Sequence, residues 1–154
     1  MNSAPKPLKL WIITRDTARV LSGIEPLTLQ FQDKIREDVG MTITKKDIND
    51  FPLVLRRFPH YPDVLYRGLF TYDTLLNNLL REKEVLTQRY LSFTKKLSIA
   101  KQYGSKMVMV LMKSKNYDIS VYSKEMEVIV DKGLELRLIG IEYDGEYKLF
   151  IVSM

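Results

Sequence analysis

The chain has 154 residues, of which 45% are hydrophobic and 28% are charged, and its formal net charge is +5. This size and composition fit one globular domain with a hydrophobic core and exclude an intrinsically disordered chain. The absence of cysteine excludes disulfides, thiolate catalysis and zinc–thiolate sites, and the single histidine, His60, cannot build a site with several histidine ligands. The positive charge favours a nucleic acid, an anionic protein surface or a phosphate-bearing ligand as partner, or it serves solubility alone.

The start of the sequence has no feature of a secretory signal. Residues 1–9 contain two prolines and two lysines but no apolar core. No run approaches the roughly 20 apolar residues of a membrane span. We therefore expect a cytoplasmic protein without a membrane partner.

The first 60 residues are predicted to be mainly helical. Helix-compatible apolar spacing covers 10–21 and 27–39, and the second of these runs is followed by a glycine that would end it. Thr44 is the predicted N-cap of a short helix that continues through Arg57. Pro52 is compatible with this helix only in its first turn or at a break.

Beyond residue 63 the sequence changes to short apolar runs that are typical of strands. Asp73 is expected to cap a helix that reaches about Lys83, and 98–103 reads as a helical turn ended by a glycine. Glycine-containing turns at 131–133 and 144–145 predict hairpins. Strands are predicted at 64–69, 85–93, 107–112, 127–130, 134–141 and 147–153. Together these elements predict an α+β fold, with a helical N-terminal third packed on antiparallel β structure.

Arg67 and Gly68 form the first motif with chemical content. They follow the apolar run 64–66, and a guanidinium at the end of a strand is suited to bidentate binding of a phosphate. Glycine would let a ligand approach the backbone. A surface arginine at a strand end is the alternative. The chain has no GxGxxG and no GxxxxGK[ST], so a nucleotide would not be bound in a Rossmann or P-loop manner.

Ser92 and Thr94 alternate at the end of the next strand-like run. Two hydroxyls on one side of a strand can position a carboxylate or hydrogen-bond a ribose. Capping of the helical segment that follows is the alternative. A serine nucleophile is disfavoured, because no histidine lies nearby in the sequence to act as its general base.

Glu125 and Glu127 lie two residues apart at the start of a strand, so both side chains are expected to point to the same face. Such a pair of carboxylates can stabilise an oxocarbenium ion while acting on an incoming nucleophile. Two solvated glutamates on an exposed strand are the alternative. Tyr122, three residues before Glu125, is either exposed for recognition or a buried anchor.

The ordered triple of Arg67, Ser92 and Glu127 resembles the R-S-E class of mono-ADP-ribosyltransferases. In that class an arginine strand precedes an S-T-S-type motif, a short A-x-x-F helix and an E-x-E glutamate motif, and here residues 100–103 stand at the helix position. The spacings are 25 and 35 residues, short but feasible for a small member. The resemblance covers about residues 64–154 and is nearest in size and motif style to small bacteriophage-encoded transferases.

The resemblance implies a fold and an activity. It implies a two-sheet antiparallel β core and a single domain over 1–154, with a helical front portion at 1–60 and an NAD-binding catalytic core at 64–154. The implied reaction transfers ADP-ribose from NAD to arginine of a host protein and releases nicotinamide, with no metal. A host protein, which could be nucleic-acid-associated, is the implied partner, RNA is an alternative target, and a monomer in the bacterial host cytosol is expected.

The resemblance also assigns cofactor-side roles residue by residue. Arg67 would contact the NAD phosphate and ribose, and the Gly68 backbone would lie near the nicotinamide amide. Ser92 would hold the catalytic glutamate, and Thr94 would support this turn. Thr94 stands where serine is usual and keeps the hydroxyl. Tyr103 replaces the commoner phenylalanine near nicotinamide, and its extra hydroxyl makes the cofactor pose less defined.

On the catalytic side, Glu127 would hydrogen-bond the 2′-hydroxyl of the nicotinamide ribose and stabilise the transition state as nicotinamide leaves. Glu125 would engage the acceptor, and Tyr122 would contribute to target recognition. Glutamate at position 125 implies arginine as acceptor. An NAD glycohydrolase, an RNA-directed transferase and a non-catalytic basic binding module on the same fold remain as alternatives. A general RNA-binding domain ranks lower, because RNP motifs are absent.

Overall fold

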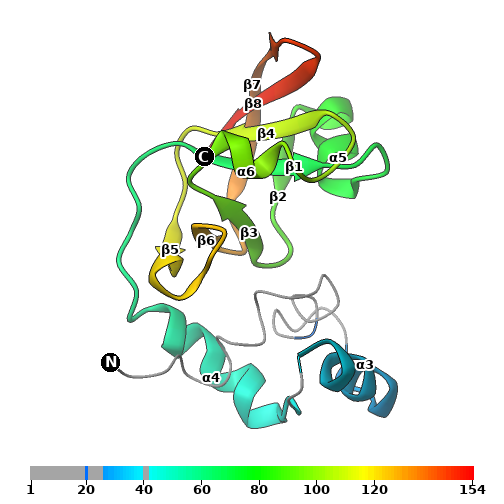
Figure 1. Ribbon diagram of the computed structural model, residues 1–154, viewed down its shortest axis with the longest axis vertical. Coiled ribbons are helices and arrows are strands. Elements are labelled where there is room, and N and C mark those ends of the chain that lie inside the picture. The colour runs from blue at the N-terminus through cyan, green and yellow to red at the C-terminus, as the bar shows by residue number, and fades with distance from the viewer. Residues whose placement is uncertain (1–19, 21–25, 40–41) are drawn as a thin grey trace.

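The computed structural model describes Val20, residues 26–39 and residues 42–154 (Figure 1). Nearly all of the helix predicted at 10–21, and the glycine expected to end the next helix, lie outside these residues. The elements in chain order are α3 (Leu29–Val39), α4 (Lys45–Leu55), β1 (Leu65–Leu69), α5 (Thr74–Glu82), β2 (Glu84–Leu86), β3 (Leu91–Thr94), α6 (Leu97–Ala100), β4 (Met107–Leu111), β5 (Asn116–Asp118), the 3₁₀ helix η1 (Ser120–Tyr122), β6 (Glu127–Val130), β7 (Glu135–Asp144) and β8 (Tyr147–Ser153). The predicted α+β class is confirmed.

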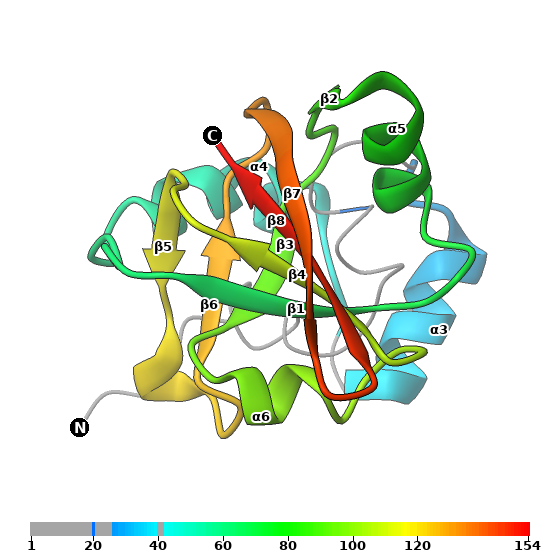
Figure 2. The ribbon, with the colours of Figure 1, turned by 90° about the horizontal axis from the view of Figure 1, so that it is seen from above.

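Hydrogen bonding joins eight strands into one sheet in the order β2-β7-β8-β4-β1-β3-β6-β5. The sheet is nearly divided in its middle, because β1 and β3 share only the register pair Tyr66↔Thr94. Figure 2 shows β3 running across β1 rather than alongside it. The hydrogen bonding therefore does not separate the two sheets that the resemblance implied, but it leaves two halves linked by one residue pair. The arrangement is also not wholly antiparallel, since β4 and β8 are parallel.

Two sequence predictions fail where the chain crosses between these halves. The run 85–93 is not one strand: β2 pairs with β7 in one half, and β3 pairs with β6 in the other. The 131–133 segment is not a hairpin turn, because β6 and β7 are not neighbours. The chain passes between the two halves after β2 and also after β6, and Thr87 links these two passages. Its N–H donates to the Leu134 carbonyl (2.9 Å), and its carbonyl accepts from the Gly133 N–H (2.8 Å). Such pairing depends on distant segments and leaves no local signal.

Helix α4 begins as predicted and tolerates its proline in an unpredicted place. Thr44 and Asp47 form a reciprocal capping box, in which each side chain accepts a backbone N–H of the other residue. Pro52 lies in the last half of the helix rather than in its first turn. The helix continues past it because Phe51 and Leu55 are fully buried, and burying such side chains contributes roughly 1.5–3 kcal/mol each.

Three apolar clusters connect the helices to the sheet. Phe51 of α4 packs with Tyr90 and Ile129 beneath the β3–β6–β5 half. Leu76 and Leu79 of α5 pack on the main core of β1, β4 and β8, whereas Leu80 of the same helix is 37% exposed. Ala100 of α6 packs on the opposite face with Val108 and Val110. Among the described residues, no helix is long and apolar enough to span a membrane.

Candidate active site

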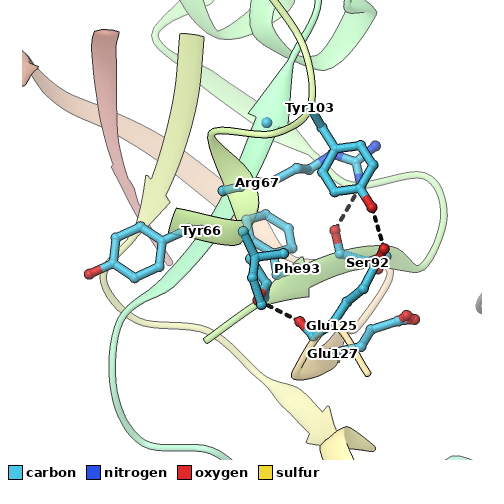
Figure 3. Close-up of a pocket in the computed structure, with 11 residues that line it drawn as sticks. Tyr66, Arg67, Ser92, Phe93, Tyr103, Glu125 and Glu127 are labelled. Atoms are coloured by element: carbon cyan, nitrogen blue, oxygen red, sulfur yellow. Dashed lines mark hydrogen bonds between the residues drawn. The ribbon is translucent and has the colours of Figure 1, made fainter. Parts of the chain in front are cut away.

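A pocket of about 230 Å³ lies where β1 and β3 part. Its walls come from β1, β3, α6 with the turn that follows it, and the start of β6 (Figure 3). Because β1 and β3 pair at one residue only, their ends on this side are free to carry side chains into the gap. The pocket is lined by Tyr66, Arg67, Gly68, Ser92, Phe93, Thr94, Ile99, Ala100, Tyr103, Glu125 and Glu127.

All three members of the ordered triple line this pocket. Arg67 links the two strands, since its Nη1 donates to the Ser92 carbonyl at 2.8 Å. In the β3–β6 ladder Thr94 lies opposite Glu127, which makes Ser92 a diagonal neighbour of Glu127 on the same face. The triple is thus brought together by two adjacent strand pairs, although its members are far apart in the chain.

Glu127 is a buried carboxyl, with a side chain that is only 3% exposed. Desolvation raises its pKa from 4.5 to about 7, and the negative charge of Glu125 adds to the rise. Hydrogen bonding to the Ser92 side chain and the positive charge of Arg67 lower the pKa and only partly offset the burial. Its Oε1 is buried without a hydrogen-bond partner among the described residues. A buried oxygen of this kind is costly unless a ligand completes its hydrogen bonding.

Glu125 enters the pocket in a different way from Glu127. The prediction of a shared strand face assumed extended backbone between the two residues, but Met126 has φ = 54° and β6 begins only at Glu127. Left-handed backbone at a non-glycine residue is uncommon, and it occurs often at functional sites. Here it turns the chain so that Glu125 is exposed while Glu127 is buried, and both still line one pocket.

Thr94 braces this turn. Its buried hydroxyl donates to the Glu125 carbonyl at 2.7 Å and accepts from the Lys96 N–H at 3.2 Å. The Lys95 N–H donates to the Met126 carbonyl at 3.1 Å, which ties the same two segments together again. The sequence suggested capping or carboxylate positioning for this hydroxyl. It does not cap α6, because the N-cap residue Lys96 has no side-chain capping bond, and its bond to the Lys96 N–H precedes the helix. The hydroxyl instead holds the backbone of the glutamate motif.

Gly68 lies against protein backbone. A Cβ at this position would come within 2.5 Å of the carbonyl oxygens of Ala100 and Tyr103. The missing side chain therefore lets the end of α6 approach β1. The sequence had indicated this space for a ligand instead. Gly68 lines the pocket as well, so its predicted place beside a ligand is not altered.

Two aromatic residues, Tyr103 and Tyr122, were also predicted to belong to the site. The Tyr103 side chain lines the pocket and is 46% exposed, and its hydroxyl donates to Glu125 Oε1. Tyr122 lies in η1, and its recognition role stays a prediction. Phe93 and Ile99 line the pocket as well, but they could not be predicted from the sequence, because apolar residues in a strand or helix carry no signal that separates a pocket wall from core.

The pocket presents charged groups of both signs. Among the described residues, no group of three histidine, aspartate or glutamate side chains lies close enough together to hold a metal ion. The pocket instead offers one guanidinium, one buried carboxyl with an open oxygen and one exposed carboxylate. Its volume is below the roughly 300–1,000 Å³ of drug-sized ligand sites, so it has room for a small molecule or for one end of a larger one.

No protein-family model matches the sequence, and no curated protein sequence matches it significantly. Solved structures do match the fold. Vis, an ADP-ribosyltransferase from Vibrio splendidus, superposes with a TM-score of 0.61 and 18% sequence identity, covering 90% of this chain and 65% of the Vis chain. A structure of Vis in complex with agmatine superposes with a TM-score of 0.56 and 21% sequence identity, covering 71% of this chain and 56% of that chain.

Two further bacterial proteins give similar values. Exoenzyme S from Pseudomonas aeruginosa, in a complex with human 14-3-3 protein beta and bound to carba-NAD, has a TM-score of 0.59 and 16% identity over 97% of this chain and 80% of that chain. An ADP-ribosyltransferase from Clostridium botulinum has a TM-score of 0.60 and 14% identity over 98% of this chain and 87% of that chain. This chain spans less than two thirds of Vis in both of its structures above. The chain has the fold of the bacterial ADP-ribosyltransferases.

Proposed function

We propose that the protein is an NAD-dependent mono-ADP-ribosyltransferase of the R-S-E class. One observation carries the proposal: within an ADP-ribosyltransferase fold, Arg67, Ser92, Glu125 and Glu127 line one pocket, and a buried oxygen of Glu127 has no hydrogen-bond partner in the described part of the chain. Any one of these residues alone has an ordinary structural explanation. Their meeting in one small pocket, from β1, β3 and the segment that leads into β6, is not explained in that way.

NAD fits this pocket with its nicotinamide-ribose end. The cavity of about 230 Å³ is too small for a whole dinucleotide, so the adenosine part would lie outside it. Arg67 would bind the diphosphate, because a guanidinium matches phosphate oxygens in charge and geometry. Glu127 Oε1 would accept a hydrogen bond from the 2′-hydroxyl of the ribose, a partner that this oxygen does not find among the residues that the structure describes.

The chemistry follows from the charge on Glu127. When the bond between ribose C1′ and the nicotinamide nitrogen breaks, both electrons leave with nicotinamide, and positive charge develops on the sugar. The carboxylate of Glu127 stabilises that charge, and its fixed position means that little reorganisation is needed at that moment. Ser92 supports the ionised form, because its hydrogen bond lowers the pKa that burial raises.

The acceptor would meet the sugar beside Glu125. This carboxylate is exposed, so it can receive a group from solvent. A guanidinium nitrogen would attack C1′ and pass one proton to Glu125, which yields ADP-ribosyl-guanidine, nicotinamide and a proton. Agmatine, which Vis binds in one of its structures, carries such a guanidinium group. We propose arginine of a host protein as the acceptor. Water and RNA are the alternative acceptors that the experiment below distinguishes from it.

Incubation with adenylate-labelled NAD and a bacterial lysate tests the activity and the acceptor together. Label that survives nuclease and is lost with protease supports transfer to protein, and the opposite result indicates RNA. Release of nicotinamide without any macromolecular label indicates a glycohydrolase. No release of nicotinamide by the wild-type protein would contradict the enzyme assignment.

Two variants locate the chemistry. Glu127→Gln should abolish both nicotinamide release and transfer while it leaves much of the NAD affinity. Glu125→Gln should reduce transfer to a guanidinium far more than hydrolysis of NAD. Equal losses of both reactions in Glu125→Gln would remove its role at the acceptor.

A further inference from the structure

The phenol of Tyr103 and the carboxylate of Glu125 meet at the pocket. Tyr103 stands in the turn after α6, and Glu125 stands just before β6, so the hydrogen bond from the Tyr103 hydroxyl to Glu125 Oε1 connects two walls of the site. Figure 3 shows the phenol directed toward Glu125. Both side chains are exposed, and so this contact is formed at the surface that an acceptor would approach.

The backbone under Tyr103 is held tightly against β1. Its N–H donates to the Ala100 carbonyl (3.1 Å), and its own carbonyl lies so close to Gly68 that no Cβ would fit there. The next residue, Gly104, has φ = 83°, and a Cβ on it would come within 2.2 Å of the Leu69 carbonyl oxygen. This close packing fixes the backbone from which the phenol extends.

The backbone under Glu125 is held equally well. Its N–H donates to the Ser123 hydroxyl (3.2 Å), and its carbonyl accepts from the Thr94 hydroxyl (2.7 Å). Both partners of the Tyr103–Glu125 hydrogen bond are thus anchored independently of the bond itself. The phenol therefore meets a side chain whose backbone is already fixed, and what it can set is the orientation of the carboxylate.

We propose that Tyr103 is a positioning residue that orients Glu125 toward a guanidinium acceptor and so favours transfer over hydrolysis. This inference rests on the proposed function. The phenol occupies Oε1 and leaves Oε2 to accept an N–H from the incoming guanidinium, which brings the attacking nitrogen to one side of the carboxylate. Water needs no such orientation and is affected less.

The phenol is suited to this role because it stays protonated. The hydrogen bond to Glu125 is the main cause that raises the pKa of Tyr103 above its ordinary value of 10.0. A phenol that remains a donor keeps Oε1 occupied throughout the working pH range. Phenylalanine at this position would keep the ring beside nicotinamide and lose only the donor.

The test compares Tyr103→Phe with the wild type, using agmatine as the guanidinium acceptor. We expect kcat/KM for agmatine to fall about tenfold, the effect of losing one hydrogen bond to a charged group. NAD hydrolysis should fall less than transfer, so that the ratio of agmatine transfer to NAD hydrolysis decreases. Equal losses in transfer and hydrolysis, or no loss in transfer, would overturn the positioning role.

A double-mutant cycle and a matched control sharpen the result. In a Glu125→Ala background, Tyr103→Phe should have no further effect on transfer, since the carboxylate that it orients is gone. An additional tenfold loss there would contradict the inference. Tyr143→Phe removes a hydroxyl from a tyrosine that is 70% exposed on β7 and should change neither reaction.

A spectroscopic readout separates this inference from the enzyme assignment. In protein with ¹³C-labelled tyrosine, the Tyr103 resonance is the one missing from Tyr103→Phe. Its titration should shift to lower pH in Glu125→Ala, and an unchanged titration would show that the hydrogen bond is absent and overturn the inference. If the titration shifts as expected but the wild type neither hydrolyses NAD nor modifies agmatine, the proposed function fails, and the acceptor role of Tyr103 fails with it.

Discussion

Replacing Glu127 by glutamine should stabilise the protein and abolish its activity. One pKa unit corresponds to about 1.4 kcal/mol, so a buried carboxyl whose pKa rises from 4.5 to about 7 destabilises the ionised folded state by about 3 kcal/mol. Between these two pKa values the folded state binds more protons than the unfolded state, and stability therefore falls as pH rises. Glutamine keeps the shape and has no charge to bury, so it avoids this loss.

Urea unfolding of both proteins across pH measures the effect. Below the unfolded pKa of 4.5 the ionisation of Glu127 costs nothing, and the loss is complete once the pH passes the folded value of about 7. The free energy of unfolding of Glu127→Gln minus that of the wild type should grow by about 2.5 kcal/mol from about pH 5 to about pH 8. The same samples should show no nicotinamide release by the variant at any pH.

The matched control is Glu125→Gln, which removes the neighbouring and exposed carboxylate. It should lose stability with rising pH much as the wild type does, because desolvation, the main cause of the raised pKa of Glu127, is unchanged and only the smaller contribution of the Glu125 charge is removed. A difference between Glu127→Gln and the wild type that stays constant across pH would refute the argument, since it would mean that Glu127 has the same proton affinity in both states. A difference that decreases as pH rises would mean that the pKa of Glu127 is lower in the folded state, and this would also contradict the argument.

Three further variants test the remaining parts of the site. Ser92→Ala removes a hydrogen bond that lowers the pKa of Glu127, so the pH–rate profile of NAD hydrolysis should move to higher pH. A profile that does not move would show that Ser92 does not influence the ionisation of Glu127. Thr94→Val should cost about 1–2 kcal/mol in urea unfolding, because the Glu125 carbonyl loses its donor, while Thr94→Ser should restore most of it. Gly68→Ala should cost about 1–3 kcal/mol and weaken NAD binding in calorimetry, whereas Gly140→Ala, where a Cβ meets nothing within 4 Å, should be near neutral.

Local signals predicted the elements whose formation depends on a few adjacent residues. Asp73 caps α5 by accepting the Leu76 N–H at 2.9 Å, as its position before an amphipathic run indicated. The strands at 127–130 and 147–153 have the predicted bounds, and the turn with Gly145 at φ = 59° joins β7 to β8 as a hairpin. Capping, alternation and positive φ are short-range properties, so a window of sequence contains them.

Pairing between distant strands was beyond the reach of such signals. The run 85–93 reads as one strand because each residue type favours extended backbone, yet its two ends pair in different halves of the sheet. The short strand β5 was missed, since Asn116–Asp118 has little strand character and is extended through its pairing with β6. Register and neighbour choice depend on the partner strand, which local sequence does not identify.

The candidate site divides in the same way. The sequence by itself determined which chemical groups are available and in what order, namely a guanidinium, a hydroxyl and two carboxylates at Arg67, Ser92, Glu125 and Glu127. Only the tertiary structure decided that one carboxylate is buried with a pKa of about 7 while the other is exposed beside Tyr103. The reason is that proton affinity depends on desolvation and neighbouring charge, and both are created by segments that meet only when the chain is folded.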